Sequence, residues 1–145
     1  MSKNIKWCFF LGLNYDQLPY LVELRNQGYK IIGCDKNPTC VGRDYCSKFI
    51  NYSYDDVKNV FNHIQSLRNI KVDFIFSAAS QRSQILASLL ADHYKVKYPS
   101  TQNIQKVLDK FKTYPFFTEN NIRIPHTTFI IDKSSINKCL NKADP

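Results

Sequence analysis

The sequence has no apolar stretch that approaches the roughly 20 residues needed to cross a bilayer. Its basic start leads only into a short apolar run, Trp7 to Leu11, with no small-residue cleavage site behind it, so a secretory signal peptide is not expected. We therefore expect a cytoplasmic protein that does not associate with membranes. With 145 residues, 43% of them hydrophobic, the chain suits one packed domain with a short extension.

The sequence also has no C-x-x-C pair, and its cysteines are odd in number: Cys8, Cys34, Cys40, Cys46 and Cys139. In a chain with this much core, a disulfide framework is not expected. Three of the cysteines recur six residues apart, whereas zinc ligands usually come in pairs two to four residues apart, so we predict no metal site. Cys8 and Cys34 lie within apolar runs and are expected to be buried.

Neither a Ser-His-Asp nor a Cys-His arrangement can be recognised, because the three histidines fall on different segments. Lys plus Arg number 20 against 12 Asp plus Glu, a formal net charge of +8. The lysines are spread over every segment rather than clustered, which favours a solvated basic surface over a nucleic-acid-binding patch. We expect no nucleic-acid partner.

Apolar periodicity predicts alternating strands and helices up to about residue 98. We expect strands over residues 5–11, 29–34, 49–50, 72–76 and 96–98. We expect helices over residues 16–27, from Ser53 to 67 with Asp55 and Asp56 in the first turn, and around 85–90. Such alternation with short connections predicts an α/β fold, a doubly wound parallel sheet.

The character of the sequence changes after Pro99. Ser100 or Thr101 can cap a helix with its apolar face at Ile104, Val107, Leu108 and Phe111. Pro115 should kink this helix or start a second one. A strand over 127–131 and a helix from Ser134 or Ser135 would follow, too little to build a core. We therefore predict an α/β domain over 1–98, linking helices over 99–126, and the truncated start of another domain over 127–145.

Three loops follow the predicted strands and should meet at one rim, because ligands of open α/β sheets bind beyond the carboxyl ends of the strands. They are residues 12–17, 35–38 and 77–82. In the first, Gly12 ends a strand, and Asn14 and Gln17 offer amide donors and acceptors to a small polar ligand. The alternative is a loop-capping Asn and a surface Gln. Asp35 begins the second loop.

The third loop contains Ser80, Gln81 and Arg82, which we expect to open a helix. Backbone N–H groups, a hydroxyl and a guanidinium at a helix start can together bind a carboxylate or a phosphate. An ordinary Ser N-cap beside an exposed Arg is the alternative. The loop gains interest because it should lie beside the other two.

A nicotinamide-dinucleotide site is the main alternative for this rim, since Gly12 follows a strand and Asp35 lies about where a ribose-binding acid would stand. Pyrophosphate binding needs several glycines for close backbone approach, and this loop has one. A protein that uses the fold only for interaction is a further alternative.

Five segments, in order along the chain, resemble a known family. They are Phe9 to Gly12, Gly28 to Pro38, Ser77 to Ser83, Asp109 to Lys112, and Asn121 to Pro125. Together they resemble the start of ATP-grasp enzymes, most nearly the carbamoyl-phosphate synthase large-chain type. Asn121 stands where that family often has glycine, which is tolerable because Asn also adopts left-handed conformations.

The resemblance implies that residues 1–98 form a Rossmann-like pre-ATP-grasp domain that helps to bind a small polar or anionic substrate. It implies that Lys110 reaches ATP phosphates. Such ligases use ATP and Mg²⁺ to turn a carboxylate into an acyl phosphate, which an amine or another nucleophile then attacks. The resemblance places a second ATP-contacting Lys and acidic Mg²⁺ ligands in a missing C-terminal ATP-grasp domain. We therefore expect no catalysis and only weak ATP binding from these 145 residues, and a homodimer is an open alternative.

Overall fold

The computed structural model describes residues 5–67, 69–125, 130, 132, 133, 135 and 136. Contacts within the chain divide it into two compact units, residues 1–105 and residues 106–145, and each unit is described by itself. None of the helices among the described residues combines the length and the apolar character that a membrane-spanning segment requires.

The first unit is built on a sheet of four parallel strands in the order β3-β2-β1-β4. The strands are β1 (Lys6–Leu11), β2 (Tyr29–Cys34), β3 (Lys48–Ile50) and β4 (Phe74–Ser77). Leu11 pairs with both Cys34 and Ser77, and Cys34 pairs with Ile50, so all four strands end at the same level. The doubly wound parallel sheet expected from the sequence is confirmed.

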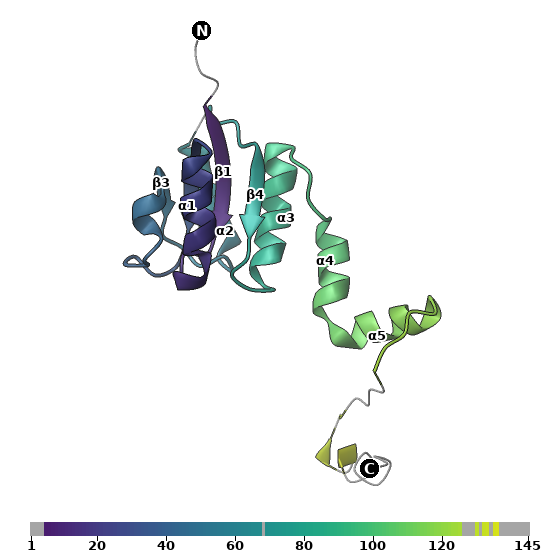
Figure 1. Ribbon diagram of the computed structural model, residues 1–145. Helices are drawn as coiled ribbons and strands as arrows, with labels where there is room; N and C mark the ends of the chain where they lie inside the picture. Colours follow the sequence, from purple (N-terminus) through teal and green to yellow (C-terminus); the bar gives the residue numbers. More distant parts are fainter. Residues whose placement is uncertain (1–4, 68, 126–129, 131, 134, 137–145) are drawn as a thin grey trace. The chain divides into compact units, whose positions relative to one another are not determined.

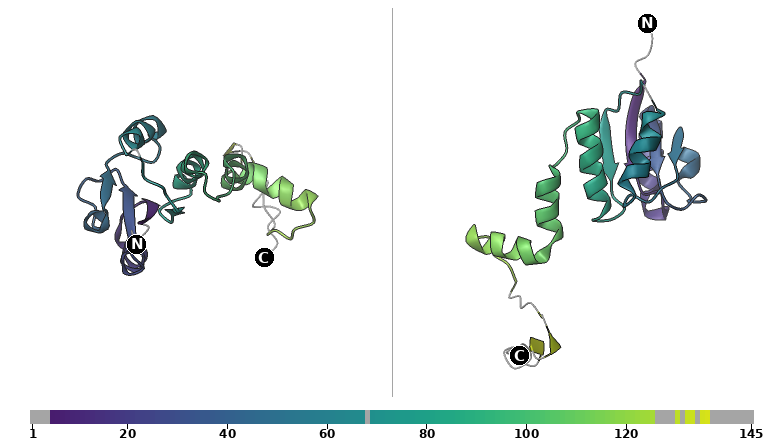
Figure 2. Two further views of the ribbon diagram at one scale, coloured as in Figure 1. Left: turned by 90° about the horizontal axis from the view of Figure 1, so that it is seen from above. Right: turned by 180° about the vertical axis from the view of Figure 1, so that it is seen from behind.

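Helices cover both faces of this sheet (Figures 1 and 2). One face of β1, with Cys8 and Phe10, packs in a cluster with Leu21 of α1 (Leu18–Asn26). The other face, with Phe9 and Leu11, packs against α2 (Val57–Gln65) and α3 (Ser83–Tyr94). This double coverage explains why β1 reads as a continuous apolar run rather than an alternating one.

Two helices of the first unit, α1 and α2, begin later than their sequence signals indicate. A single 3₁₀ turn, η1 (Tyr15–Gln17), precedes α1. Asp56 rather than Ser53 is the N-cap of α2, because its carboxylate accepts a hydrogen bond from the backbone N–H of Asn59. Residues 53–55 therefore form a loop ahead of the helix. A second 3₁₀ turn, η2 (Arg43–Tyr45), lies between β2 and β3.

The predicted strand over residues 96–98 does not form, so this prediction is wrong. Lys95 ends α3 in a left-handed conformation, φ 59°, and turns the chain out of the helix. Side-chain hydrogen bonds then hold the following segment against α3. The Tyr98 hydroxyl donates to Gln84, and the hydroxyls of Ser88 and Thr101 lie 3.0 Å apart.

Two helices form after Pro99, α4 (Thr101–Leu108) and α5 (Lys110–Glu119), but Pro115, where the sequence predicted a kink or a second start, lies inside α5. The break falls at Asp109, whose extended backbone leaves its carboxylate free to accept from the N–H of Phe111, 3.0 Å away. The buried Thr113 hydroxyl donates to the carbonyl of Lys106, 2.5 Å away. Both ends created by the break are thus capped by side chains.

Asn121 follows α5 with a φ of 55°, the left-handed conformation expected of an Asn in a glycine position. The N–H of Ile122 then donates to the carbonyl of Phe117, 2.8 Å away, which closes the helix end. The predicted strand over 127–131 and the helix after Ser134 or Ser135 lie largely outside the described residues.

Candidate functional site

Strands β1 and β4 define where a ligand would bind. β1 and β4 are neighbours, yet the helix that follows β1 covers one face and the helix that follows β4 covers the other. In open parallel sheets, this reversal opens a crevice at the carboxyl ends of the two strands. These ends point toward the lower edge of the sheet in Figure 1. The first and third loops predicted from the sequence begin there.

The first and third loops meet at Gly12. Its backbone adopts φ +84°, and its N–H donates to the carbonyl of Cys34, 3.0 Å away. A Cβ atom at this position would lie only 2.1 Å from the Cβ of Ala79. Glycine is thus required here both for the backbone conformation and for the close approach of the third loop.

Gln17 joins the same two loops through its side chain. Its Oε1 accepts from the N–H of Asn14, 3.0 Å away, and its Nε2 donates to the carbonyl of Ala78 at 3.4 Å. Only 5% of Gln17 is exposed, so its amide is engaged within the protein. The Asn14 residue, by contrast, is exposed at the rim.

Asp35 directly follows β2 and is buried, and its carboxylate accepts hydrogen bonds from both the first and the second loop. One carboxylate oxygen accepts from the N–H of Leu13, 2.8 Å away, and the other accepts from the N–H of Asn37 at 2.9 Å. The side chain of Asn51 donates to the Asp35 carbonyl, 2.9 Å away. Asp35 thereby fixes the first loop relative to the second.

A cluster of serine hydroxyls shapes the third loop. The Ser83 hydroxyl donates to the carbonyl of Ser80, 2.6 Å away, so the Ser77 hydroxyl, also 2.6 Å away, must be its donor. The Ser80 hydroxyl accepts from the N–H of Ser83, 3.2 Å away. Ser80 therefore caps the first residue of α3, and Gln81 and Arg82 form the turn before the helix.

Gln81 and Arg82 are exposed. No acceptor within the described residues takes a hydrogen bond from their backbone N–H groups. The Arg82 Nε lies 3.3 Å from a carboxylate oxygen of Asp55, and 75% of the Arg82 side chain is exposed. The rim therefore presents a guanidinium and amide groups, the donors that suit a carboxylate or a phosphate.

Sequence reasoning missed Asp55, which lies on the loop between β3 and α2. It was assigned to the first turn of a helix that in fact starts two residues later. The rule that places ligands at the carboxyl ends of strands applies equally to β3. Applied to the short strand at Phe49 and Ile50, that rule would have brought residues 51–56 into the candidate site.

Lys110 opens α5 in the second unit, where it is exposed. Asp109, the N-cap of the same helix, lies 3.7 Å from Lys112. The role of Lys110 toward ATP stays a prediction.

The cysteines of the first unit are free thiols, of which Cys8, Cys34 and Cys40 are buried. Burial raises the pKa of Cys8, Cys34 and Cys46 to about 12, and it also raises the pKa of Cys40. Thiols in this state are poor nucleophiles and poor metal ligands. Among the described residues, no group of three or more His, Cys, Asp or Glu could hold a metal ion.

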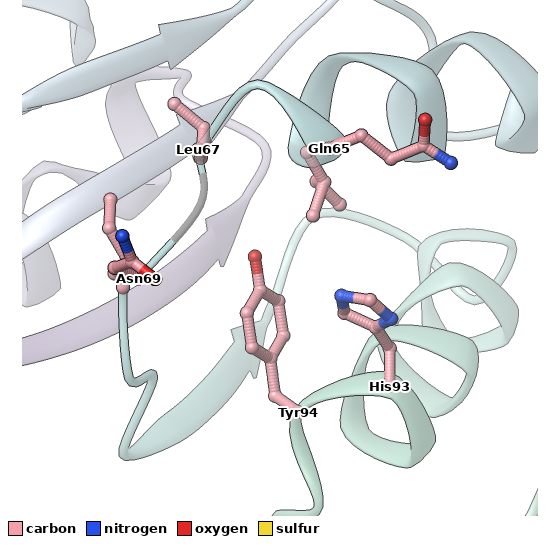
Figure 3. Close-up of a pocket in the computed structure, with 7 residues that line it drawn as sticks. Gln65, Leu67, Asn69, His93 and Tyr94 are labelled. Atoms are coloured by element: carbon pink, nitrogen blue, oxygen red, sulfur yellow. The ribbon is translucent and has the colours of Figure 1, made fainter.

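Two cavities between described residues lie away from the carboxyl rim. One, of about 360 Å³, lies near the amino end of β4 and is lined mainly by the ends of α2 and α3 (Figure 3). The other, of about 480 Å³, lies between α1 and η2. Neither involves Gly12, Asp35 or Arg82.

No protein-family profile and no curated protein sequence matches the chain. Solved structures do. Phosphoribosylglycinamide synthetase from Anaerococcus prevotii is similar over 98% of this chain and 36% of its own, with a TM-score of 0.73 and 12% identity. N5-carboxyaminoimidazole synthetase from Staphylococcus aureus, in complex with ADP, is similar over 94% of this chain and 35% of its own (TM-score 0.69, 20% identity).

L-amino acid ligase from Bacillus licheniformis is similar over 97% of this chain and 43% of its own, with a TM-score of 0.68 and 11% identity. These proteins are ATP-grasp ligases, and the matched part is their N-terminal region. The chain spans little more than a third of the length of the first two. At such identities the likeness establishes the fold alone, a Rossmann-like parallel α/β domain followed by helices.

Proposed function

We propose that this chain is the N-terminal, substrate-binding portion of an ATP-grasp ligase that joins a carboxylate to an amine. The fold it shares with three kinds of ligase supports the proposal. The observation that carries it is the meeting of the first and third loops at the switch point between β1 and β4, with Arg82 exposed beside them.

The rim residues divide into two roles under this proposal. Gly12, Gln17 and Asp35 shape the rim, because their polar groups or their lack of a side chain are used to hold loops together. Asn14, Ser80, Gln81 and Arg82 form the surface that meets the substrate. A guanidinium with neighbouring N–H groups suits a small anionic substrate, a carboxylate or a phosphate.

The work of this chain in such a reaction is to bind and orient the substrate. ATP, when bound, supplies the phosphoryl group that activates a carboxylate as an acyl phosphate. Among the described residues, no group of three or more His, Cys, Asp or Glu could hold Mg²⁺. Lys110 is the residue of this chain that we propose to contact ATP phosphates, because a compact ammonium suits phosphate oxygens.

The nicotinamide-dinucleotide alternative is disfavoured by the same contacts. The missing side chain of Gly12 makes room for Ala79 rather than for a pyrophosphate. Both carboxylate oxygens of Asp35 already accept backbone N–H bonds, and Asp35 is only 6% exposed, so its carboxylate is poorly accessible to a ribose hydroxyl. Fluorescence titration with reduced nicotinamide cofactor discriminates the two, since saturable binding would favour the alternative.

Titration of the ¹⁵N-labelled chain with malonate and with inorganic phosphate tests the proposed site. We expect saturable shifts of the backbone amides of residues 80–83 and their loss in Arg82→Gln. Arg25→Gln is the matched control. It removes the same charge from the last turn of α1, which lies at the amino ends of the strands, away from the rim. Equal shifts in both variants would refute the anion site.

A further inference from the structure

The loop between β3 and α2, residues 51–56, runs along the carboxyl ends of the strands. β3 and β4 are the two outer strands of the sheet, yet this loop starts at β3 and reaches the turn that follows β4. Near its start, the Asn51 side chain donates to the carbonyls of Asp35 and Lys36, at 2.9 and 3.0 Å. The carbonyl of Tyr52 accepts from the Cys34 thiol, and Asp55 then meets Arg82.

The last of these contacts places a carboxylate of the protein on the guanidinium that the proposed site offers to an anion. Among the described residues, Arg82 is the only partner of the Asp55 side chain. The loop is anchored independently of this pair, by Asn51 at one end and by Asp56, the cap of α2, at the other. Separation of Asp55 from Arg82 therefore breaks no other side-chain contact of the loop.

We propose that Asp55 is a built-in competitor for Arg82, which an anionic substrate displaces when it binds at the rim. The inference rests on the proposed anion site and adds a regulating residue to it. A carboxylate or phosphate can replace Asp55 because it offers the same acceptor oxygens to the guanidinium. A neutral ligand brings no negative charge to replace that of Asp55, so Asp55 also selects against uncharged molecules.

Exposure limits the size of the effect. The side chains of Arg82 and Asp55 are 75% and 47% exposed, and exposed ion pairs are weak because water and salt screen them. We expect Asp55→Asn to tighten anion binding by about two- to fivefold. The gain should shrink as the salt concentration rises, since the competing pair is itself screened.

The test is the titration of the 145-residue chain with malonate and, separately, with inorganic phosphate, followed at the amides of residues 80–83. Asp55→Asn should lower the apparent Kd by that factor. Asp44→Asn, which makes the same charge change at an exposed position of η2, should leave it unchanged. In an Arg82→Gln background, Asp55→Asn should have no effect. The two anions show whether carboxylate or phosphate is preferred.

The outcomes separate this inference from the proposed site. If the wild-type chain binds either anion but Asp55→Asn behaves like Asp44→Asn, Asp55 is no competitor, although the site stands. If no variant binds either anion, Asp55→Asn included, the site itself is refuted and the competitor with it.

Discussion

Gly12 and Ala79 approach so closely that the Cβ missing from the first would lie 2.1 Å from the Cβ of the second. The contact joins the loop that follows β1 to the loop that follows β4, at the point where the helices diverge to opposite faces of the sheet. The rim therefore depends on a residue that has no side chain.

Gly12→Ala should lower the free energy of unfolding by about 2–4 kcal/mol. Roughly 1 kcal/mol arises from the positive φ, and the remainder from overpacking against Ala79, whose methyl group cannot move aside without the backbone. Gly28→Ala is the matched control, because Gly28 has a φ of +83° and a Cβ added to it would meet nothing within 4 Å. Urea unfolding measures both.

Ala79→Gly should partly rescue Gly12→Ala, because it removes the methyl group with which the new side chain collides. A double-mutant cycle gives the interaction energy. If the two substitutions prove additive, the loops do not meet as described.

Asp35→Asn should destabilise the first unit by about 1–3 kcal/mol. The amide NH₂ would turn a donor toward one of the two backbone N–H groups, of Leu13 or Asn37, that now donate to the carboxylate. Asp44→Asn, at an exposed residue, should change stability by less than about 0.5 kcal/mol. Equal urea midpoints for the two variants would contradict the structural role given to Asp35.

Tyr98→Phe and Tyr94→Phe should have different effects on stability. The Tyr98 hydroxyl donates to Gln84, whose amide in turn donates to the carbonyl of Ser77, 2.9 Å away. Its removal should cost about 1 kcal/mol. The buried Tyr94 hydroxyl, which points into the cavity of Figure 3, has no hydrogen-bond partner among the described residues.

Tyr94→Phe should therefore be neutral or slightly stabilising, since it removes a buried polar atom that gains nothing from the protein. Thermal unfolding of both variants makes the comparison. A loss of stability in Tyr94→Phe as large as that in Tyr98→Phe would show that the Tyr94 hydroxyl is bonded.

The buried Cys8 and Cys34 and the half-buried Cys46 should resist modification in the folded chain. Burial raises the pKa of Cys8, Cys34 and Cys46 from 9.0 to about 12, so about one thiol in ten thousand is ionised at pH 8, against about one in ten when unfolded. In a Cys139→Ser variant, Ellman's reagent should label these residues slowly until guanidinium is added. Rapid labelling under native conditions would contradict their burial.

The same shift makes stability depend on alkaline pH. The folded-state pKa lies above the unfolded value, so the folded chain holds its thiol protons more tightly than the unfolded chain does. This contribution is fully present below about pH 9 and is lost as the pH rises from 9 toward 12. Replacement of Cys34 by alanine should flatten the fall of the urea midpoint over that range.

The sequence predicted most of the sheet because a strand that is buried on both faces has a continuous run of apolar residues. The run from Trp7 to Leu11 is apolar throughout, and β1 is covered by helices on both sides. Gly28 and Asn121 likewise indicated helix ends, and both have positive φ. The strand expected over 96–98 does not form, because Val96 and Tyr98 pack beside α3 instead. The local sequence pattern does not distinguish these two arrangements.

The candidate site could be predicted only in part. Proximity of Gly12, Asp35 and Ser80 to one rim follows from strands that end at the same level, and the sequence alone indicated those strands. The functions of individual side chains did not follow. The sequence suggested that Gln17 and Asp35 bind a ligand. In the fold, Gln17 instead donates to the backbone carbonyl of Ala78, and Asp35 accepts from the backbone N–H of Leu13.

The amino-acid sequence by itself determined the order of strands and helices, the parallel sheet and the loops that form its rim, because periodicity and turn residues act over a few neighbours. Only the tertiary structure decided which polar groups are used up inside the protein and which remain at its surface. The pairing of Asp55 with Arg82 joins residues 27 positions apart. Such a contact depends on how α2 and α3 pack on the sheet, and that packing is a property of the whole fold.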